Sequence, residues 1–425
     1  LMDPNTLQIL NDPVGYMPQE KLRIFLSDIK LDQIVSLMSV NILGIPLGII
    51  SSILVARFLG VNDYGNYMFI VNVISLAITF CTFGLYHAAN RAITICDDKK
   101  KIREYYGAML LISFALFTII YILLLNYALF DYNVNAKGIT DVFIYILPFC
   151  WVFIFVQFFE VLLQASNEIK ILSKTRLYPK LIYCISVLYI YFIVKEYHHD
   201  KVIFITYLWL FSQFIVFLFM FFKLKVSFEK MKLRIKEIFT YNNSYGIYVY
   251  MGTIFAVGFS QLSTILISYF GDDNSGVAYY TLALTIASPL LFIPTTVATT
   301  HFKEFSKIDS INNKILLITF SLSIISLLIS WILIEPFVKI FYGTEFNQVI
   351  NLFYIVSAGV VLYGLADFYN RFLGANGRGK MLRNCSFIVG FCLLIFNITL
   401  IPNFGDTGAA LTKLFTGLVY FISIR

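Results

Sequence analysis

The sequence predicts an all-α polytopic membrane protein, with about twelve transmembrane helices in two six-helix bundles related by a pseudo-two-fold axis. Hydrophobic residues make up 59% of its 425 residues and charged residues only 13%, against about 45–50% and about 25% in soluble domains. The apolar residues gather in runs of transmembrane length, and short motifs of the first half recur about 211 positions later. A soluble core of this size cannot bury so much apolar surface, so lipid must solvate most of it.

Each apolar run of about 20 residues is interpreted as one span, because lipid leaves no backbone group unpaired and favours helices. The segment 1–33 before the first run is rich in polar residues and contains no cleavable signal peptide, and we expect it to be cytoplasmic. The predicted spans are 34–57, 67–86, 107–130, 143–165, 178–194, 202–222, 245–269, 277–299, 315–334, 349–366, 384–401 and 408–425.

Lysine and arginine are divided unevenly between alternate loops. With these spans, 26 of the 32 lie on one side, five on the other, and Lys413 alone lies within a span. Cytoplasmic loops are the ones enriched in Lys and Arg, so the basic side and both termini are predicted to be cytoplasmic. The densest basic stretch, 223–244, is predicted to be an amphipathic cytoplasmic linker between a first bundle, 34–222, and a second, 245–425. The net charge of +7 therefore serves topology, and we expect no nucleic-acid partner.

Two pairs of motifs support the division into bundles. "ARFLGVNDYGNY" (56–67) resembles "SYFGDDNSGVAY" (268–279), and "LQASNEIKILSK" (163–174) resembles "LGANGRGKMLRN" (373–384). The first pair follows span one of each half and the second follows span four. Six is an even number of spans, so the halves are parallel copies, and a cleft between them can open to either side as the bundles rock.

Glycines in the first pair of motifs suggest a structural role. Gly60 and Gly271 lie 211 positions apart, as do Gly65 and Gly276. We expect all four to supply the geometry of a tight turn on the outer side. In span eight, "IASPLLFIPTT" contains two prolines that predict a kink, which would serve as a hinge.

Several stretches together resemble the Wzx-type polysaccharide (O-antigen) flippases, members of the MOP superfamily with the MATE drug exporters and the lipid II flippases. They are "ARFLGVNDYGNY", "QLSTILISYFGDDNSGVAYYTLAL", "FYGTEFNQVINLF", "FLGANGRGK" and "IPNFGDTGAAL". The resemblance extends over nearly the whole chain from Ile34. One departure is Ser263, where members often carry an Asp, which leaves any ion coupling through that position in doubt.

The resemblance implies a MATE-like fold and the flipping of an oligosaccharide on undecaprenyl pyrophosphate across the bacterial inner (plasma) membrane. The product would feed O-antigen, capsule or exopolysaccharide biosynthesis. Membrane lipid, the lipid-linked glycan and other polysaccharide-assembly proteins are the expected partners. No cofactor is expected, and the sequence leaves open whether H⁺, Na⁺ or the membrane potential drives the cycle.

Ionisable residues within spans are candidates for substrate contact, because burying each in the bilayer centre costs at least about 2.5–3.5 kcal/mol. Lys413 lies inside span twelve, in "GAALTKLFTG", and either contacts the pyrophosphate or an acidic sugar or extends to the outer headgroups. Arg57 ends span one on the side where cations are sparse, so topology does not explain it. Substrate contact and anchoring are both open for Arg57.

Three further candidates lie near the cytoplasmic side. Arg91, in "YHAANRAI", and Lys180, beside Pro179, are candidates for first capture of the pyrophosphate, although cations are expected there for topology. Glu160 either pairs with a cation such as Arg91 or Lys180, or titrates as a coupling group. Asp367 has a weaker case, because Arg371 one turn later is a suitable local partner.

The sequence contains no P-loop, nucleophile elbow, H-E-x-x-H motif or Gly-rich dinucleotide turn. The six cysteines form no C-x-x-C pair and are interpreted as structural thiols. We therefore expect a transporter rather than an enzyme. The alternatives are a drug or lipid II exporter of the same superfamily, or a membrane polymerase or ligase of the same pathway, which would generally have a larger outer loop.

Overall fold

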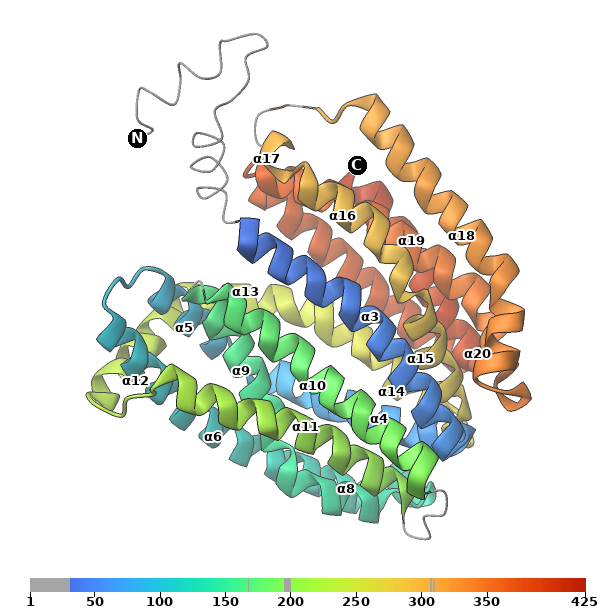
Figure 1. The fold of residues 1–425 in the computed structure, drawn as a ribbon, viewed down its shortest axis with the longest axis horizontal. Coiled ribbons are helices and arrows are strands. Elements are labelled where there is room, and N and C mark those ends of the chain that lie inside the picture. The colour runs from blue at the N-terminus through green and yellow to red at the C-terminus, as the bar shows by residue number, and fades with distance from the viewer. Residues whose placement is uncertain (1–30, 167, 195–199, 306–307, 309) are drawn as a thin grey trace.

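The computed structural model describes residues 31–425 apart from 167, 195–199, 306–307 and 309. In this part of the chain every regular element is a helix, and the long helices run in the same general direction (Figure 1). Eight described helices are long and apolar enough to cross a membrane, or nine if the pair Thr140–Phe149 and Trp151–Ala165, bent by 47°, is one span. The chain is therefore a multi-pass membrane protein. The predicted segment 1–33 lies almost entirely outside the described residues.

The first half of the chain forms long and short helices, most of them joined by short connections. They are α3 (Leu31–Leu59), α4 (Val61–Cys81), α5 (Leu85–Thr94), α6 (Lys99–Phe130), α7 (Tyr132–Ala136), α8 (Thr140–Ile146), η2 (Leu147–Phe149), α9 (Trp151–Ala165), α10 (Ile169–Tyr189), η3 (Ile190–Val194) and α11 (Lys201–Leu224). Asp98 and Asp131 cap α6 and α7, because each side chain accepts a hydrogen bond from a backbone N–H of the first turn.

The second half follows a short helix, α12 (Met231–Tyr241). Its elements are η4 (Asn242–Gly246), α13 (Ile247–Thr253), η5 (Ile254–Gly258), α14 (Phe259–Phe270), α15 (Ser275–Ala287), η6 (Ser288–Leu291), α16 (Phe292–Thr300), α17 (Phe302–Phe305), α18 (Asn313–Phe341), η7 (Thr344–Phe346), α19 (Gln348–Ala375) and α20 (Gly379–Ile424). In Figure 1, α16 to α20 gather on one side and most first-half helices on the other, with α3, α14 and α15 between them.

The last helix, α20, folds back on itself. Gly405 has a left-handed φ of +56°, which glycine adopts at little cost. Beyond it, Cys385 Sγ donates to the carbonyl of Ser423 at 3.1 Å, so the two ends of α20 lie side by side. A Cβ on Gly408 would stand 2.3 Å from the Leu400 carbonyl oxygen. The absence of a side chain at Gly408 allows the two arms to pack closely.

Two other helices are interrupted, one of them as predicted. Between α15 and α16, the 3-10 turn η6 begins at Ser288 and contains Pro289, so the regular α-helix is interrupted where the sequence predicted a kink. Between α4 and α5, Phe83 and Gly84 both have left-handed φ values, +47° and +79°. A Cβ on Gly84 would stand 2.6 Å from the Gly246 backbone, so glycine is required here for contact with η4.

The two repeated motifs contact each other in the structure. A Cβ on Gly65, in α4, would stand 1.8 Å from the carbonyl oxygen of Asn274, which precedes α15. The side chain of Asn274 donates to Asn66 Oδ1 at 2.7 Å, and its backbone N–H donates to Asn62 Oδ1 at 3.1 Å. Gly65 therefore allows the first half and the second half to approach each other at the predicted outer end.

The prediction that all four motif glycines shape turns is wrong in part. Gly60 has a φ of +78°, as a turn glycine should. Gly271 has an ordinary extended conformation, with φ −95° and ψ 150°. Gly65 and Gly276 lie inside α4 and α15. The repeat correctly pointed to Gly65 as a structural glycine. Its reason, however, is close packing against Asn274, which no local pattern in the sequence reveals.

The linker region is held to the first half by a buried ion pair. Arg234 of α12 donates from Nε to Glu104 of α6 at 2.8 Å, and the two side chains are 8% and 3% exposed. Glu237 also accepts from Arg234, at 2.6 Å. A Cβ on Gly107 would stand 2.1 Å from the Ser227 carbonyl oxygen, so the chain before α12 also packs closely on α6. The amphipathic pattern of 223–244 thus includes one cation that faces protein.

Gly65→Ala should destabilise the protein by about 1–3 kcal/mol, because the new methyl group overlaps the Asn274 carbonyl and forces α4 away from α15. Thermal unfolding of the purified protein in detergent measures this. Gly252→Ala in α13 is the matched control, since no atom lies within 4 Å of its Cβ position, and alanine is favoured over glycine in a helix by about 1 kcal/mol. Equal melting temperatures for the two variants would contradict the close contact.

Arg234→Met should cost about 3–5 kcal/mol, because it leaves the Glu104 carboxylate buried without its cation. The double variant Arg234→Met with Glu104→Leu should recover most of the loss, since no charge then remains buried. The control is Lys100→Met, which removes an ion pair with Glu229 whose side chains are 66% and 59% exposed, and it should leave the melting temperature unchanged. A stable single variant would show that the ion pair contributes nothing.

Candidate functional site

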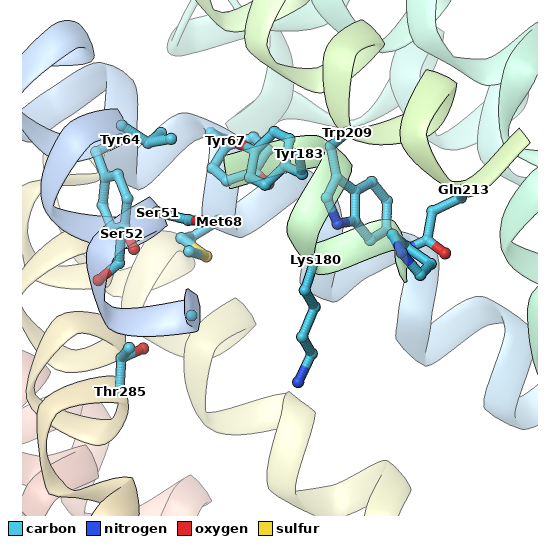
Figure 2. A pocket seen from close by; sticks show the side chains of 13 residues that line it. Ser51, Ser52, Tyr64, Tyr67, Met68, Lys180, Tyr183, Trp209, Gln213 and Thr285 are labelled. Carbon is cyan, nitrogen blue, oxygen red and sulfur yellow. The ribbon is translucent and has the colours of Figure 1, made fainter. Parts of the chain in front are cut away.

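A cavity of about 210 Å³ lies within the first half of the chain. Four helices, α3, α4, α10 and α11, supply most of its walls, and α15 of the second half contributes Thr285 (Figure 2). The residues that line it are Gly48, Ser51, Ser52, Val55, Tyr64, Tyr67, Met68, Pro179, Lys180, Tyr183, Trp209, Gln213 and Thr285. We call this cavity the first-half pocket.

Lys180 is the cation of the first-half pocket. Figure 2 shows its side chain extending from α10 at the edge of the pocket, pointing away from the Tyr67, Tyr183 and Trp209 rings. Its Nζ lies 3.3 Å from where a Cβ on Gly44 would stand, so the glycine in α3 leaves room for the ammonium group. Among the side chains that the structure describes, none forms a hydrogen bond or ion pair with Lys180. The charge of Lys180 is therefore available to a ligand.

Polar atoms without partners occur in several residues of the first-half pocket. In the described part of the chain, five buried side-chain oxygens have no hydrogen-bond partner, and three of them belong to residues that line the first-half pocket. These three are the hydroxyls of Tyr64 and Tyr183 and Oε1 of Gln213. Tyr64 is fully buried, and the hydroxyl of Tyr183 lies near that of Tyr67. An unpaired buried polar group costs about 1–3 kcal/mol, so these atoms indicate a site for a polar ligand.

Lys413, the sequence candidate in the second half, lies apart from the first-half pocket. Its Nζ is 3.7 Å from the centre of the Tyr363 ring of α19, a cation–π contact. The Lys413 backbone packs on Gly359, where a Cβ would stand 2.8 Å from the Lys413 carbonyl oxygen. No acidic side chain of the described residues forms an ion pair with Lys413. The side chain thus lies against a neighbouring helix.

Arg57 takes part in a group of contacts between the two halves at the predicted outer end. Its Nη2 donates to the Ile340 carbonyl of α18 at 2.5 Å. Lys137 donates to the backbone and side chain of Ser268, and to Asn274 Oδ1 at 3.1 Å. Together with the Asn66–Asn274 hydrogen bond, these residues form the outer contact cluster: Arg57, Asn66 and Lys137 of the first half, and Ser268, Asn274 and Ile340 of the second.

Ionisation in this cluster follows from burial. Burial of the ammonium group lowers the pKa of Lys137, against the attraction of the nearby Asp273 and Asp272. The hydroxyl of Ser275 donates to Asp273 and lowers the pKa of its carboxyl, so this acid stays charged beside Lys137. The outer contact cluster is therefore a polar network in which two cations, Arg57 and Lys137, donate to amide, hydroxyl and carbonyl oxygens.

The remaining sequence candidates lie near the predicted cytoplasmic side. Glu160 accepts from Arg176, at 3.2 Å between Oε1 and Nε, so its partner is neither of the two cations that the sequence suggested. Arg176 lies on α10 and faces α9 directly, whereas Arg91 is exposed at the end of α5. Asp367 accepts from Arg371 at 2.9 Å, which confirms the expected local pair.

Ser263 is buried at the position of the missing Asp. It donates to Asn397 Oδ1 at 2.8 Å, and Asn397 Nδ2 donates to the Phe259 carbonyl at 3.0 Å. A closed network of neutral groups therefore occupies this position in the second half. Among the described residues, no three His, Cys, Asp or Glu side chains are placed so that they could hold a metal ion.

Comparison with known proteins identifies the fold. The chain superimposes on the lipid II flippase MurJ in an inward-closed conformation with a TM-score of 0.70, at 15% identity, over 92% of this chain and 86% of that one. It superimposes on an inward-facing multidrug resistance MATE family transporter of the MOP superfamily with a TM-score of 0.69, at 14% identity, over 90% and 94%. The chain therefore has the fold that these two solved structures share.

The sequence identifies the family. Residues 31–302 match the polysaccharide biosynthesis protein family. The chain belongs to this family. It is also 24% identical over 400 residues to the capsular polysaccharide biosynthesis protein CapF of Staphylococcus aureus, covering 90% of this chain and 95% of that protein. The resemblance that the quoted motifs suggested is confirmed.

Most of the first-half pocket of this polysaccharide biosynthesis protein was missed by sequence reasoning. Lys180 was a candidate, but Tyr64, Tyr67, Trp209 and Gln213 were not. A signal was present, because Tyr64 and Tyr67 stand in the repeated motif "ARFLGVNDYGNY". The motif was interpreted through its glycines alone. Trp209 and Gln213 lie in an almost wholly apolar helix, and nothing local distinguishes their positions from lipid-facing ones.

Loss of the outer contact cluster should expose the interior to the outer side. Ser52→Cys places a thiol beside Tyr342, beneath the cluster, and should resist a membrane-impermeant maleimide added to intact cells. Adding Lys137→Met and Asn274→Ala removes the central hydrogen bonds and should increase labelling severalfold. Lys339→Gln, whose residue pairs only with Glu335 on its own helix among the described residues, is the control. Unchanged labelling of the triple variant would show that the cluster does not hold the halves together.

Proposed function

We propose that this protein translocates an oligosaccharide linked to undecaprenyl diphosphate from the cytoplasmic to the outer leaflet of the inner (plasma) membrane. Membership of the polysaccharide biosynthesis family and the MOP transporter fold support the proposal. The observation that carries it is Lys180, an unpaired cation in a pocket lined by polar and aromatic groups between membrane-spanning helices. Such a pocket can shield a charged, hydroxyl-rich head group while the lipid tail stays in the bilayer.

The proposed architecture has twelve spans in two bundles, 34–222 and 245–425, joined by the linker 223–244. Eight or nine helices are long and apolar enough to cross the membrane. The fold-back of α20 supplies one more span. The last two proposed spans are α10 and the helix that runs through α13 and α14. The first contains four basic residues, and π-helical turns divide the second into short pieces, so neither is apolar enough or long enough as a single regular helix. The offset of 210–211 between motifs supports a pseudo-two-fold relation between the bundles.

The proposed cycle is alternating access. The outer contact cluster joins the ends of the two halves, and Gly65 allows them to meet closely. Opening to the outer side would separate these contacts, and the break at η6 in the α15–α16 helix would act as the hinge. A substrate must bind the two states with different free energies to shift this equilibrium. The first-half pocket satisfies that condition in principle, because Thr285 of the second half forms part of its wall.

The candidate residues then have separate proposed roles. Lys180 would bind an anionic group of the substrate in the first-half pocket. Lys413 would offer a second cation to the substrate from the second half, held in position by the Tyr363 ring. Arg91, exposed at the predicted cytoplasmic side, would attract the diphosphate on entry. Arg57 would hold the outer end closed, and Glu160 would orient Arg176 near the pocket entrance.

Lys180→Gln should slow flipping about tenfold or more, since a hydrogen bond to a charged group contributes about 1.5–3 kcal/mol and 1.4 kcal/mol is a factor of ten. The assay uses proteoliposomes that contain the lipid-linked oligosaccharide and measures its exposure to a membrane-impermeant lectin. Lys180→Arg should retain part of the activity. Lys174→Gln, an exposed lysine on the same helix, is the matched control and should flip at the parental rate.

The same preparation tests the class of function. A protein that leaves the lipid-linked oligosaccharide on its original leaflet but exports drugs or lipid II would contradict the proposed substrate. A protein that lengthens or transfers the glycan would be a polymerase or ligase, and mass spectrometry of the recovered glycan detects this. In cells, a deletion strain should accumulate the lipid-linked oligosaccharide on the cytoplasmic leaflet.

A further inference from the structure

We propose that the first-half pocket holds one sugar ring of the substrate, with an oxyanion next to that ring paired with Lys180. This inference rests on the function proposed above and adds to it which part of the substrate enters the pocket. It separates sugar recognition, in the first half, from whatever holds the lipid tail. Its basis is the size of the pocket, the aromatic walls and the chemistry of the unpaired atoms.

The size of the pocket selects a single ring. A volume of about 210 Å³ would hold about seven water molecules at ~30 Å³ each. This is the scale of one six-membered sugar ring rather than of an oligosaccharide or of a lipid chain. The rest of the glycan must then lie outside the pocket, on the side where Lys180 stands at its edge (Figure 2).

The walls combine flat apolar faces with hydroxyl groups. Tyr64, Tyr67, Tyr183 and Trp209 line the pocket, and Trp209 is supported from behind by Phe153, with ring centroids 4.1 Å apart. Aromatic faces pack against the C–H faces of a sugar ring, and the polar edges of Tyr and Trp bond to its hydroxyls. An acyl chain would gain nothing from the polar edges. The walls therefore match a polyol with apolar faces.

The unpaired atoms require both donors and acceptors from the ligand. Gln213 Oε1 can only accept, whereas the hydroxyls of Tyr64 and Tyr183 can donate and accept. A sugar hydroxyl does both, so a ring with several hydroxyls can pair with either kind of atom. Figure 2 shows Tyr64 and Gln213 at opposite ends of the pocket, so a single ring meets the oxygens of one part of the pocket and not all three. A phosphate without protons only accepts and would leave Gln213 Oε1 unpaired. The orphaned oxygens thus favour a sugar ring over a bare diphosphate in the depth of the pocket.

Lys180 supplies the remaining interaction at the edge of the pocket. It lines the same pocket as Trp209, and no acidic side chain of the described residues forms an ion pair with it. An ammonium group at this position pairs with an oxyanion attached to, or adjacent to, the bound ring. The oxyanion can be the diphosphate of the lipid carrier, which places the first sugar in the pocket. It can equally be the carboxylate of an acidic sugar, and the experiment below distinguishes the two sources.

Trp209 provides a direct reporter, because the chain has only three tryptophans. Trp151 packs against Phe155, Phe214 and Phe217, and Trp331 donates to Ser357, so neither lines the pocket. The variant Trp151→Phe with Trp331→Phe retains Trp209 alone. The experiment titrates this protein in nanodiscs with undecaprenyl-diphosphate-linked oligosaccharide, with undecaprenyl diphosphate, and with the free oligosaccharide released from the first ligand.

The lipid-linked oligosaccharide should change Trp209 emission saturably, and undecaprenyl diphosphate, which lacks the sugar ring, should change it less. Gln213→Met should raise the dissociation constant obtained from the sugar-dependent Trp209 signal about tenfold. The substitution removes the unpaired acceptor Oε1 at nearly constant side-chain volume. Gln261→Met is the matched control, since Gln261 Oε1 is also buried without a partner among the described residues but lies outside the pocket. Lipid-linked sugar that leaves Trp209 emission unchanged, or a response of equal size to undecaprenyl diphosphate, would overturn the proposal.

Lys180→Gln distinguishes the sources of the oxyanion. If the oxyanion is the diphosphate, the variant should weaken binding of the lipid-linked oligosaccharide and leave that of the free oligosaccharide unchanged. If it is a sugar carboxylate, binding of both should weaken, and reduction of the carboxylate should have the same effect as the substitution. If Lys180→Gln weakens the binding of neither the lipid-linked nor the free oligosaccharide, the proposed role of Lys180 is wrong. Proteoliposome flipping with an unresponsive Trp209 would reject only this inference, whereas sugar binding without flipping would reject only the transport function.

Discussion

In the interior of a membrane no water replaces a missing hydrogen bond, so each polar side chain there needs a partner within the protein. Most of this chain obeys that constraint locally: Thr206 and Thr281, for example, donate to carbonyls one turn earlier. Elsewhere the constraint joins distant elements, as where Ser263 bonds to Asn397. Three of the five unpaired buried oxygens among the described residues belong to the first-half pocket, where a polar ligand would supply partners. The functional interpretation depends on this contrast.

The pocket and the outer contact cluster are physically connected. Ser52 lines the pocket and shares a hydrogen bond of 2.8 Å with the hydroxyl of Tyr342 in the second half. Two residues earlier, the carbonyl of Ile340 accepts from Arg57, which ends the same helix as Ser52. A ligand that moves α3 against the end of α18 therefore acts on both the wall of the pocket and the closure of the outer end. This continuity is the structural basis on which binding could bias the position of the halves.

Sequence reasoning found the spans more readily than the site. Membrane helices are specified by composition over about 20 residues, and the break at Pro289 follows from a missing N–H donor, so both can be predicted locally. Glu160 shows the limit: the sequence suggested an ion pair but named the wrong cations, because α9 and α10 bring Arg176 close only after they pack. Gly65 was noticed through its repeat, yet its reason is an atom of Asn274 more than 200 residues away.

The amino-acid sequence by itself determined that most of the protein lies in lipid, that it is helical and that its basic loops alternate. It also determined the family. Each of these depends on composition or on short ordered motifs. Only the tertiary structure decided which polar residues meet. Gln213 and Trp209 lie in a helix whose apolar surroundings look the same toward lipid and toward protein. Their environment is set by the rotation of α11 against α3, α4 and α10. That rotation results from side-chain packing over the whole bundle, which no local pattern in the sequence records.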